Sequence, residues 1–383
     1  MKITIVNSFY PPWRGGAETH VYNLAKQLKK RGHEITIICG DAPLQAGTEI
    51  DNGIKVHRLR IVGRMYGTPV IPKLPLELAS QDSQIIHANF PSPLNAYFVS
   101  VASRLRSIPA VLTWHNDLPP VTSTARVLVL AHDRLVLPLY LPQFRYIVAT
   151  SEIYSQTSAI LSNQRNRVVV IPNGVDTERF SPRIQGDGVR ARLSLRKSSV
   201  VLFVGALTRW HRYKGLDTLM RSIALLKSTL SQLKLVVVGG GELATEYLQL
   251  ARQLGICDRV VFAGNVHDDE LPAYYACSDV LVLPSKDRSE GFGLTILEAN
   301  ATGKPAIGTK VGGIPDAIRD GYNGLLVPPN DAKALADAIC KVVTNDSLLK
   351  QMGKNGRIFA EQHDWSTIAE RTENLYKRAL SMQ

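Results

Sequence analysis

The chain has 383 residues, 45% hydrophobic and 7% aromatic, and carries 45 Lys and Arg against 33 Asp and Glu, a formal net charge of +12. This length and apolar content are enough for two hydrophobic cores, and no proline-rich, Gly/Ser-rich or Gln/Asn-rich tract indicates extended disorder. No run of 18 uncharged apolar residues occurs, which argues against a membrane-spanning helix, and the apolar start at 3–6 is too short for a signal peptide. We therefore expect a cytoplasmic protein of two domains.

The positive charge is concentrated in the first part of the chain. Residues 1–170 hold 18 Lys and Arg but only 10 Asp and Glu, which is +8 of the total +12. Such an excess attracts phosphates, anionic membranes or nucleic acid without choosing among them. No basic helix and no sheet with interleaved aromatics is visible, so we expect no nucleic-acid partner. The four cysteines form no C-x-x-C pair, so we expect reduced, mostly buried thiols and no metal site.

The predicted elements alternate between strand and helix. In the first half we expect strands at 2–7, 34–39, 56–59, 83–88, 109–114, 146–150 and 168–172, and helices at 17–30, 93–106 and 152–162. In the second half we expect strands at 199–205, 233–241, 260–264, 280–284, 305–309 and 324–328, and helices at 216–227, 242–255, 269–277, 293–302, 315–320, 331–344, 346–361 and 366–381. Val- and Ile-rich runs without alternation are typical of parallel strands buried on both faces. The sequence thus predicts two doubly wound α/β domains, residues 1–172 with the C-terminal helix 366–383, and residues 173–365.

Ligands of open α/β sheets bind beyond the carboxyl ends of the strands, and two turns of the first half stand out there. At 11–20, Gly15 and Gly16 directly precede a helix, whose N-terminus can receive an anion. The pattern is neither a P-loop nor a dinucleotide fingerprint, so an ordinary turn stays open. At 113–120, His115 follows an apolar strand; a structural or solvated histidine is the alternative.

Two turns of the second half are richer in charge. The loop 205–217 holds four groups that can carry positive charge and could neutralise a diphosphate, although a solvated basic loop is also possible: Arg209, His211, Arg212 and Lys214. At 289–299, Glu290 precedes a glycine turn and Glu298 lies within the helix that follows. Burying Glu298 among apolar neighbours without a partner would be costly, which favours a ligand over an unrelated surface glutamate.

These four segments, in this order, resemble the retaining glycosyltransferases of family 4. The most specific parts are the E-x7-E block from Glu290 to Glu298, PNGVD at 172–176, and VGGIPDAIRDGYNGLLVPP at 311–329. The resemblance covers nearly the whole chain and implies the GT-B fold, two Rossmann-like domains facing across a cleft. It also implies that the first domain binds the acceptor and the second the nucleotide-sugar donor.

The resemblance implies a role for each matching residue. Gly15 and Gly16 would approach the donor diphosphate and shape the acceptor cleft. His115 would hydrogen-bond the transferred sugar near the reaction centre, and Lys214 would contact the diphosphate. Glu290 would act beside them on the hydroxyls of the transferred sugar.

The resemblance also indicates which turn would bind the donor, and this chain departs from the family pattern at one position. Phe292, Gly293 and Leu294 would contact sugar and phosphates through their backbone, and Glu298 would bind the ribose hydroxyls. The family arginine is missing, because Ala206 stands in its place.

Two arginines of the basic loop could supply that missing charge. Lys214 follows Ala206 after seven intervening residues, later than is usual in the family. Either Arg209 or Arg212 could take the place of the missing arginine, and we favour Arg209 slightly.

The resemblance implies retaining transfer of a hexose from GDP-mannose or a UDP-hexose to a lipid-linked or polysaccharide acceptor. The departing phosphate would deprotonate the acceptor, and no cofactor would be needed. We expect no divalent metal either, since the acidic run at 268–270 looks like a helix start. A sugar-nucleotide epimerase of the same architecture and a non-catalytic sugar-nucleotide-binding protein remain the alternatives.

Residues 121–145 mix aliphatic side chains with Arg126, Arg134 and Arg145. Such a segment can lie on an anionic membrane surface, whereas a core helix with snorkelling arginines explains it equally well. We expect an enzyme that associates peripherally with the inner face of a membrane.

Overall fold

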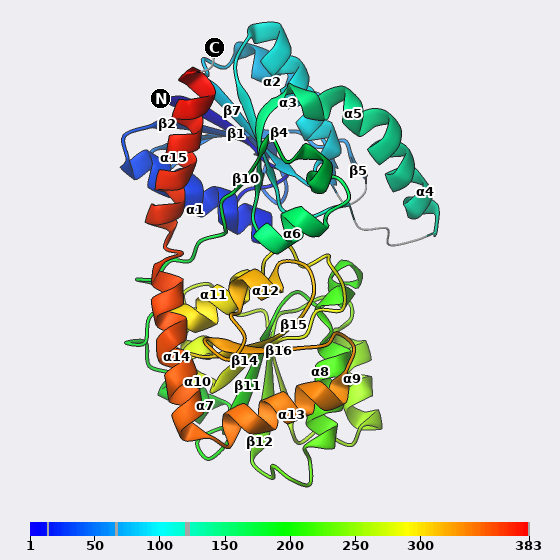
Figure 1. Ribbon diagram of the computed structural model, residues 1–383, viewed down its shortest axis with the longest axis vertical. Helices are drawn as coiled ribbons and strands as arrows, with labels where there is room; N and C mark the ends of the chain where they lie inside the picture. The colour runs from blue at the N-terminus through cyan, green and yellow to red at the C-terminus, as the bar shows by residue number, and fades with distance from the viewer. Residues whose placement is uncertain (14, 66–67, 119–122, 382–383) are drawn as a thin grey trace. The chain divides into compact units, whose positions relative to one another are not determined.

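The computed structural model describes residues 1–13, 15–65, 68–118 and 123–381. It divides into two compact units, Met1–Asn173 with Trp365–Gln383, and Gly174–Asp364 (Figure 1). The expected boundaries lie one residue from these, while the substrate that each unit binds stays a prediction.

The first unit is built on an eight-stranded sheet in the order β10-β9-β8-β7-β1-β2-β4-β3. Its strands are β1 (Lys2–Val6), β2 (Glu34–Gly40), β3 (Gly47–Asp51), β4 (Ile54–Leu59), β7 (Ile85–Phe90), β8 (Ala110–Trp114), β9 (Phe144–Ala149) and β10 (Val168–Val170). Every neighbouring pair is parallel except β3 and β4. The parallel strands confirm the prediction, but β3 and the small hairpin of β5 (Gly63–Met65) and β6 (Thr68–Val70) were not predicted.

Helices cover both faces of this sheet because its strands present apolar side chains on both sides. Ile3 and Ile5 belong to a core with α1 (Gly16–Lys30) and α15 (Trp365–Ser381). Val6 points to the opposite core, which contains the remaining helices. That second core is covered by α2 (Leu74–Ser80), α3 (Pro93–Arg106), α4 (Ser123–Ala131), α5 (Leu137–Tyr140), the 3₁₀ helix η2 (Leu141–Gln143), α6 (Glu152–Thr157) and η3 (Leu161–Gln164). The π-helix η1 (His132–Val136), between α4 and α5, has no buried residue.

The last helix returns to the first unit, as expected. In Figure 1, α15 lies alongside α1. The Glu373 carboxylate on α15 forms ion pairs with Arg31, next to the end of α1, and with Lys377. The Tyr376 hydroxyl lies 2.5 Å from the Nδ1 of His87, inside β7. The buried contact between Tyr376 and His87 therefore anchors this helix to the sheet. Residues 382–383 of the expected helix lie outside the described range.

The second unit has a six-stranded parallel sheet in the order β13-β12-β11-β14-β15-β16. Its strands are β11 (Ser199–Val204), β12 (Leu233–Val238), β13 (Val260–Gly264), β14 (Val280–Leu283), β15 (Ala306–Thr309) and β16 (Gly324–Val327). Its helices are α7 (Asp187–Arg192), η4 (Arg209–Lys214), α8 (Leu216–Leu225), α9 (Ala244–Gln253), α10 (Leu271–Cys277), α11 (Leu294–Ala301), α12 (Ile314–Ala317), α13 (Ala332–Val343) and α14 (Asp346–Glu361). Val201 faces a core with α8, α9 and α13, whereas Val200 faces one with α10 and α11. Two doubly wound α/β units are thus present, as predicted.

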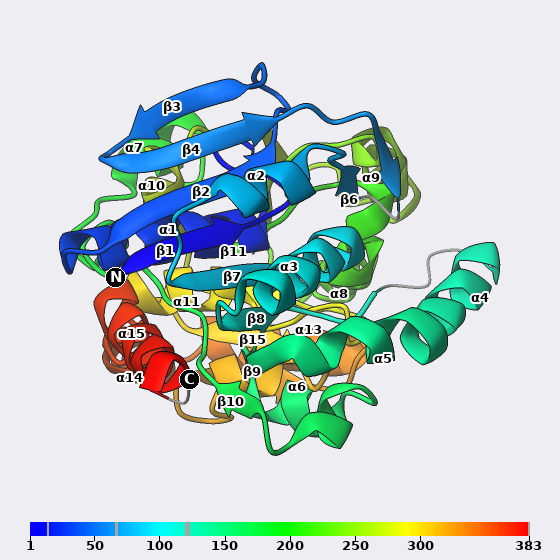
Figure 2. The same cartoon turned by 90° about the horizontal axis from the view of Figure 1, so that it is seen from above.

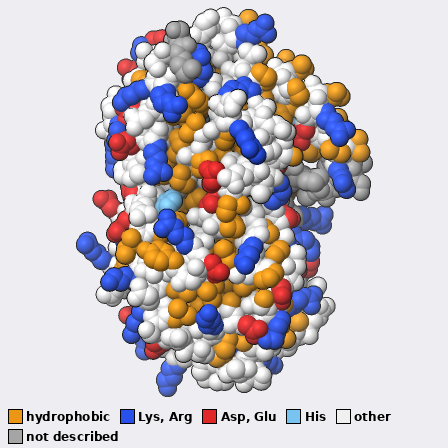
Figure 3. Space-filling model, in the orientation of Figure 1, with side chains coloured by type: hydrophobic (Ala, Val, Ile, Leu, Met, Phe, Trp, Pro, Cys, Tyr) orange, Lys and Arg blue, Asp and Glu red, His pale blue; other side chains and the backbone are white. Residues whose placement is uncertain are grey.

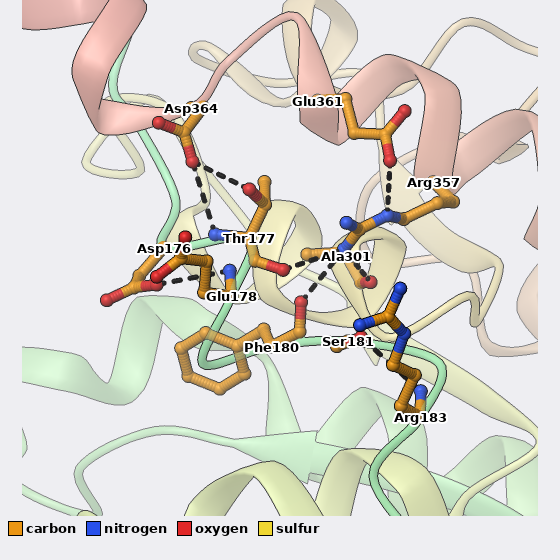
Figure 4. A network of polar contacts seen from close by, with 10 residues as sticks. All are labelled: Asp176, Thr177, Glu178, Phe180, Ser181, Arg183, Ala301, Arg357, Glu361 and Asp364. Atoms are coloured by element: carbon orange, nitrogen blue, oxygen red, sulfur yellow. Dashed lines mark hydrogen bonds and ion pairs between the residues drawn. The ribbon is translucent and has the colours of Figure 1, made fainter.

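One arginine joins the beginning and the end of the second unit (Figure 4). The Nη1 of Arg357, on α14, donates to the backbone oxygens of Thr177 and Phe180 at 3.0 Å and of Ala301 at 2.9 Å. Because Ala301 is the last residue of α11, this cation also lies at the negative end of that helix dipole. Arg357 therefore fixes α11, which carries Glu298.

In the first unit, α4 extends away from the sheet and α5 leads back to it (Figure 2). Residues 121–122 of the segment that we singled out lie outside the described range. Of the helices that the structure describes, none is both long and apolar enough to span a bilayer. The cysteine prediction holds in part: all four thiols are free, but Cys257 is exposed.

Candidate active site

The turn between β1 and α1 places Gly15 just before the helix and Gly16 at its first position. A Cβ on Gly15 would lie 2.2 Å from Oε2 of Glu18, so this carboxylate folds back over the turn. Glu18 is buried, and burial raises the pKa of its carboxyl to about 7. Arg14, in the same turn, lies outside the described residues. Backbone amides at this helix start are thus accompanied by a carboxyl group that sequence reasoning missed.

His115 follows β8 and is held in one tautomer. Asn89, at the carboxyl end of β7, donates from its Nδ2 to the Val6 backbone oxygen at 3.2 Å. Its Oδ1 therefore faces the Nε2 of His115 at 3.0 Å, so that this nitrogen carries the proton and donates. Burial, together with nearby His20, holds the pKa of His115 well below its usual range. The neutral ring leaves its Nδ1 as an acceptor without a partner among the described residues.

A second buried histidine lies against the first. The rings of His20, on α1, and His115 meet edge to face with centroids 4.9 Å apart. The Nδ1 of His20 lies 2.7 Å from Oδ1 of Asn173, in the PNGVD motif. Burial lowers the pKa of His20 to about 4, and in the described part of the chain its Nε2 has no hydrogen-bond partner. Neither partnership was predicted, because the contacts join segments far apart in sequence.

In the second unit, glycines allow two loops to approach closely. Gly312 has φ +55°, and a Cβ there would lie 2.0 Å from the backbone oxygen of Glu290. The neighbouring Gly313 donates its N–H to that same oxygen at 3.0 Å. The VGG sequence thus presses the loop after β15 against the turn after β14. Gly293, with φ +94°, then opens α11.

Lys214 and Glu290, both predicted site residues, form an ion pair. Their Nζ and Oε2 atoms are 2.8 Å apart, and the side chains are only 15% and 10% exposed. The lysine stem passes over Gly205 at the end of β11, where a Cβ would lie 2.9 Å from Lys214 Cδ. Burial acts to lower the pKa of Lys214, but Glu290 outweighs this, so the pKa lies above its usual range. The site therefore holds a permanently charged ammonium.

The two candidate arginines differ in their partners. Arg212 binds both oxygens of the Glu246 carboxylate, at 2.8 and 2.6 Å. The backbone N–H of Arg209 donates to Glu242, but its exposed guanidinium forms no ion pair with any described residue. Only Arg209 is thus available to a ligand without breaking an existing pair.

Glu298 lies on α11 and is half-buried. Tyr275, from α10, donates its hydroxyl to Oε2 of Glu298 at 2.5 Å. Burial raises the pKa of Glu298 to about 7, while Tyr275 and the Arg179 charge act to lower it. The preceding Phe292 is buried, and Leu294 begins the helix.

The acidic run at 268–270 directly precedes α10, as expected for a helix start. Among the residues that the structure describes, no three His, Cys, Asp or Glu side chains lie close enough together to hold a metal ion. Whether the reaction requires a metal stays a prediction.

Two family models match the chain. The model described as "Glycosyltransferase Family 4" matches residues 14–179, and that described as "Glycosyl transferases group 1" matches residues 189–359. Each match covers most of one unit.

Similar proteins extend over the whole length. The D-inositol 3-phosphate glycosyltransferase of Acidothermus cellulolyticus is 30% identical, over 96% of this chain and 86% of that protein. The GDP-mannose-dependent alpha-(1-6)-phosphatidylinositol monomannoside mannosyltransferase of Mycobacterium tuberculosis is 27% identical, over 96% of both. The structure of Anabaena HepE in complex with UDP-glucose superposes with a TM-score of 0.77 at 24% identity, over 98% of this chain and 100% of that one, and shares the fold. The chain therefore belongs to the family 4 glycosyltransferases, a retaining family of GT-B fold.

Proposed function

We propose that the protein transfers a hexose, with retention of configuration, from GDP-mannose or a UDP-hexose to a lipid-linked or polysaccharide acceptor. The observation that carries this proposal is the Lys214–Glu290 pair beside the glycine turn that opens α11. A fixed positive charge and a carboxylate lie here at the carboxyl ends of the neighbouring strands β11 and β14, and this supports a site for a diphosphate and a sugar. The name of the mycobacterial relative, which gives GDP-mannose as donor, supports the choice of donor class.

The donor would bind to the second unit. Glu298 accepts the ribose hydroxyls, and the backbone N–H groups of Phe292, Gly293 and Leu294 face the phosphates with the positive end of the helix dipole. Glu290 accepts hydroxyls of the transferred sugar. These donors and acceptors are in place before the ligand arrives, so little reorganisation is needed.

The chemical step needs positive charge on the leaving group. The bond between the anomeric carbon and the diphosphate oxygen breaks, and its electron pair leaves with the nucleoside diphosphate. Lys214 and Arg209 stabilise that negative charge. The acceptor oxygen attacks the anomeric carbon from the same face, and its proton passes to the departing phosphate. The products are the glycosylated acceptor and the nucleoside diphosphate, and no divalent metal is required.

The first unit would bind the acceptor. His115 stays neutral and accepts a sugar hydroxyl at Nδ1, because its Nε2 proton is committed to Asn89. Gly15 and Gly16 have no side chain that would obstruct the acceptor, and their backbone N–H groups can receive an anion.

A surface of the first unit supports a membrane-bound acceptor. We call the described residues 126–140 the arm. Val129, Leu137 and Tyr140 of the arm are buried in the core of the first unit. Six other large hydrophobic side chains of the arm are 40–70% exposed: Val127, Leu128, Leu130, Leu135, Val136 and Leu139. Arg126 and Arg134 are exposed on the same segment, and Figure 3 shows apolar and basic side chains mixed over the region of α4 and α5. Exposed leucines with cations suit the interface of an anionic bilayer, whereas a core helix would bury these leucines.

Transfer and membrane binding require separate tests. Release of UDP or GDP from UDP-glucose or GDP-mannose, with extracted lipid acceptors and glycan oligomers, tests transfer. An unchanged anomeric configuration is expected, and an inverted product or an epimerised free sugar nucleotide would contradict the proposal. For the membrane, co-sedimentation with phosphatidylglycerol vesicles should fall in Leu135→Ser/Leu139→Ser and in Arg126→Glu/Arg134→Glu. It should be unchanged in Leu248→Ser, an exposed leucine of the second unit. Equal sedimentation of all variants would refute membrane binding.

A further inference from the structure

Glu298 can bind ribose only if its carboxylate is held in one orientation. A glutamate side chain has three rotatable bonds, and α11, which carries it, has only eight residues. Among the described residues Tyr275 is the one hydrogen-bond donor to this carboxylate, through Oε2. Within the described ranges the other oxygen, Oε1, has no donor, so it can accept from a ligand.

Tyr275 is itself rigidly placed. It is fully buried, and its ring packs edge to face against Phe180, with centroids 5.6 Å apart and an angle of 87°. Phe180 in turn belongs to the segment fixed by Arg357. Burial holds the pKa of the Tyr275 phenol well above its usual range, so the hydroxyl always keeps its proton and donates. The hydroxyl is therefore a fixed donor aimed at one oxygen of Glu298.

We infer that Tyr275 is a positioning residue for donor binding, which acts by fixing the Glu298 carboxylate so that its free oxygen accepts the ribose hydroxyls. This inference rests on the proposed role of Glu298. Tyr275 touches no ligand in this account, so its whole effect passes through Glu298. That property separates it from a residue that contacts the nucleotide directly.

The adjacent tyrosine provides a matched control. Tyr274 lies on the same helix and is also buried, but its hydroxyl accepts from Arg192 Nη2 at 3.0 Å. Tyr275→Phe and Tyr274→Phe each remove one hydroxyl from α10 with minimal change of shape. A general weakening of α10 would appear in both variants, whereas loss of positioning would appear only in Tyr275→Phe.

The experiment is a double-mutant cycle on nucleotide binding. Calorimetry with UDP and GDP gives Kd for wild type, Tyr275→Phe, Glu298→Ala and the double variant. We expect Tyr275→Phe to raise Kd by about tenfold, as for loss of a hydrogen bond to a charged group. In the Glu298→Ala background, Tyr275→Phe should raise Kd by less than about twofold, because the carboxylate that Tyr275 positions is gone. A 2′,3′-dideoxy nucleoside diphosphate, which lacks both ribose hydroxyls, should bind wild type and Tyr275→Phe equally.

The pH profile provides an independent readout. The charged groups facing Glu298 besides Tyr275 are Arg179, Asp268 and Lys214. These groups act equally in the wild type and in Tyr275→Phe. Any difference between the two pH profiles of Kd therefore reports the tyrosine hydroxyl. Nucleotide Kd in the wild type should rise as the pH falls below about 7, where Glu298 gains its proton. In Tyr275→Phe this rise should begin at a higher pH, because the carboxylate has lost a donor that lowers its pKa.

The possible outcomes distinguish a failure of the proposed function from a failure of the positioning role of Tyr275. If the wild type binds neither UDP nor GDP, the proposed function fails. If both Glu298→Ala and Tyr275→Phe weaken binding but their effects multiply in the double variant, the positioning role is refuted while the proposed function stands. Equal effects of Tyr274→Phe and Tyr275→Phe would also refute it.

Discussion

The Lys214–Glu290 pair yields a prediction in which stability and activity diverge. Lys214→Met leaves the Glu290 carboxylate buried without a cation, and Glu290→Gln leaves the ammonium without an anion. Breaking a buried pair by removing one partner typically costs about 3–5 kcal/mol. Since the side chains keep 15% and 10% exposure, we expect the lower end, about 3 kcal/mol for Lys214→Met. Glu290→Gln should cost about 2 kcal/mol, because the glutamine oxygen still accepts from the ammonium.

The double variant Lys214→Met/Glu290→Gln removes both charges. It should be more stable than Lys214→Met alone, with a loss of about 1 kcal/mol. Activity should not recover, because the diphosphate has lost its ammonium: we expect kcat/KM to fall by about 10²–10³ in Lys214→Met and in the double variant alike.

Differential scanning calorimetry of the unliganded protein measures the stability part. For a unit of this size about 3 kcal/mol corresponds to roughly 6–12 °C in Tm. Lys333→Met is the matched control, since its pair with Asp337 is 72% and 63% exposed and should contribute less than about 0.5 kcal/mol. If the double variant loses the sum of the single losses, the pair is not coupled and the reasoning is refuted. Wild-type turnover in Lys214→Met would refute the catalytic role.

Four further outcomes follow from the same geometry. Arg209→Ala should lower kcat by about 10²-fold with an unchanged Tm, whereas the kcat of Arg212→Ala should stay within about threefold of wild type. If a turnover assay gives the reverse order, the missing charge is supplied by Arg212. Because burial raises the pKa of Glu298 to about 7 from 4.5, its ionised form costs stability, so the unliganded protein should gain stability as the pH falls from about 7 toward 4.5. Glu298→Gln should raise the Tm at pH 8 and flatten that pH dependence, and a Tm lowered at pH 8 would contradict the sign. Arg357→Ala should cost about 2–3 kcal/mol in calorimetry, because three backbone oxygens lose their donor, while Glu361→Gln should cost less than about 0.5 kcal/mol; similar losses would show that the three acceptors find other donors. Finally, initial rates should be equal with and without EDTA, and abolition of transfer would overturn the metal-independent mechanism.

The sequence was informative where burial leaves a compositional signal. Parallel strands such as β11 are covered on both faces, so their apolar runs stand out, and their order predicts both sheets. The antiparallel edge strand β3 has no such signal, because all its residues except Asp51 are exposed and only the backbone pairing with β4 defines it. The hairpin of β5 and β6 is too short for any periodicity.

For the site, the sequence could indicate positions but not partners. His115, Lys214, Glu290 and Glu298 lie at strand ends or in the helix that follows, where sequence order alone suggests a ligand. Asn89 was not predicted, because it lies just beyond the strand expected at 83–88.

Other partners gave no signal at all. His20 meets Asn173 across 153 residues, and Tyr275 reaches Glu298 from another helix. Such contacts depend on how helices pack on the sheet, which periodicity does not contain. The pairing of Arg212 with Glu246, which favours Arg209 as the residue free to bind a ligand, was likewise not visible in the sequence.

The most direct test of the central claim, a nucleotide-sugar site built on Lys214 and Glu298, is thermal stability in the presence of UDP, GDP and ADP. A nucleotide at about 100 times its Kd adds roughly 2.7 kcal/mol, which corresponds to about 5–11 °C for a unit of this size. We predict that UDP or GDP raises the Tm of the wild type, and that this rise is lost in both Lys214→Met and Glu298→Ala. A Tm unaffected by both UDP and GDP, or a rise that survives in both variants, would contradict the account.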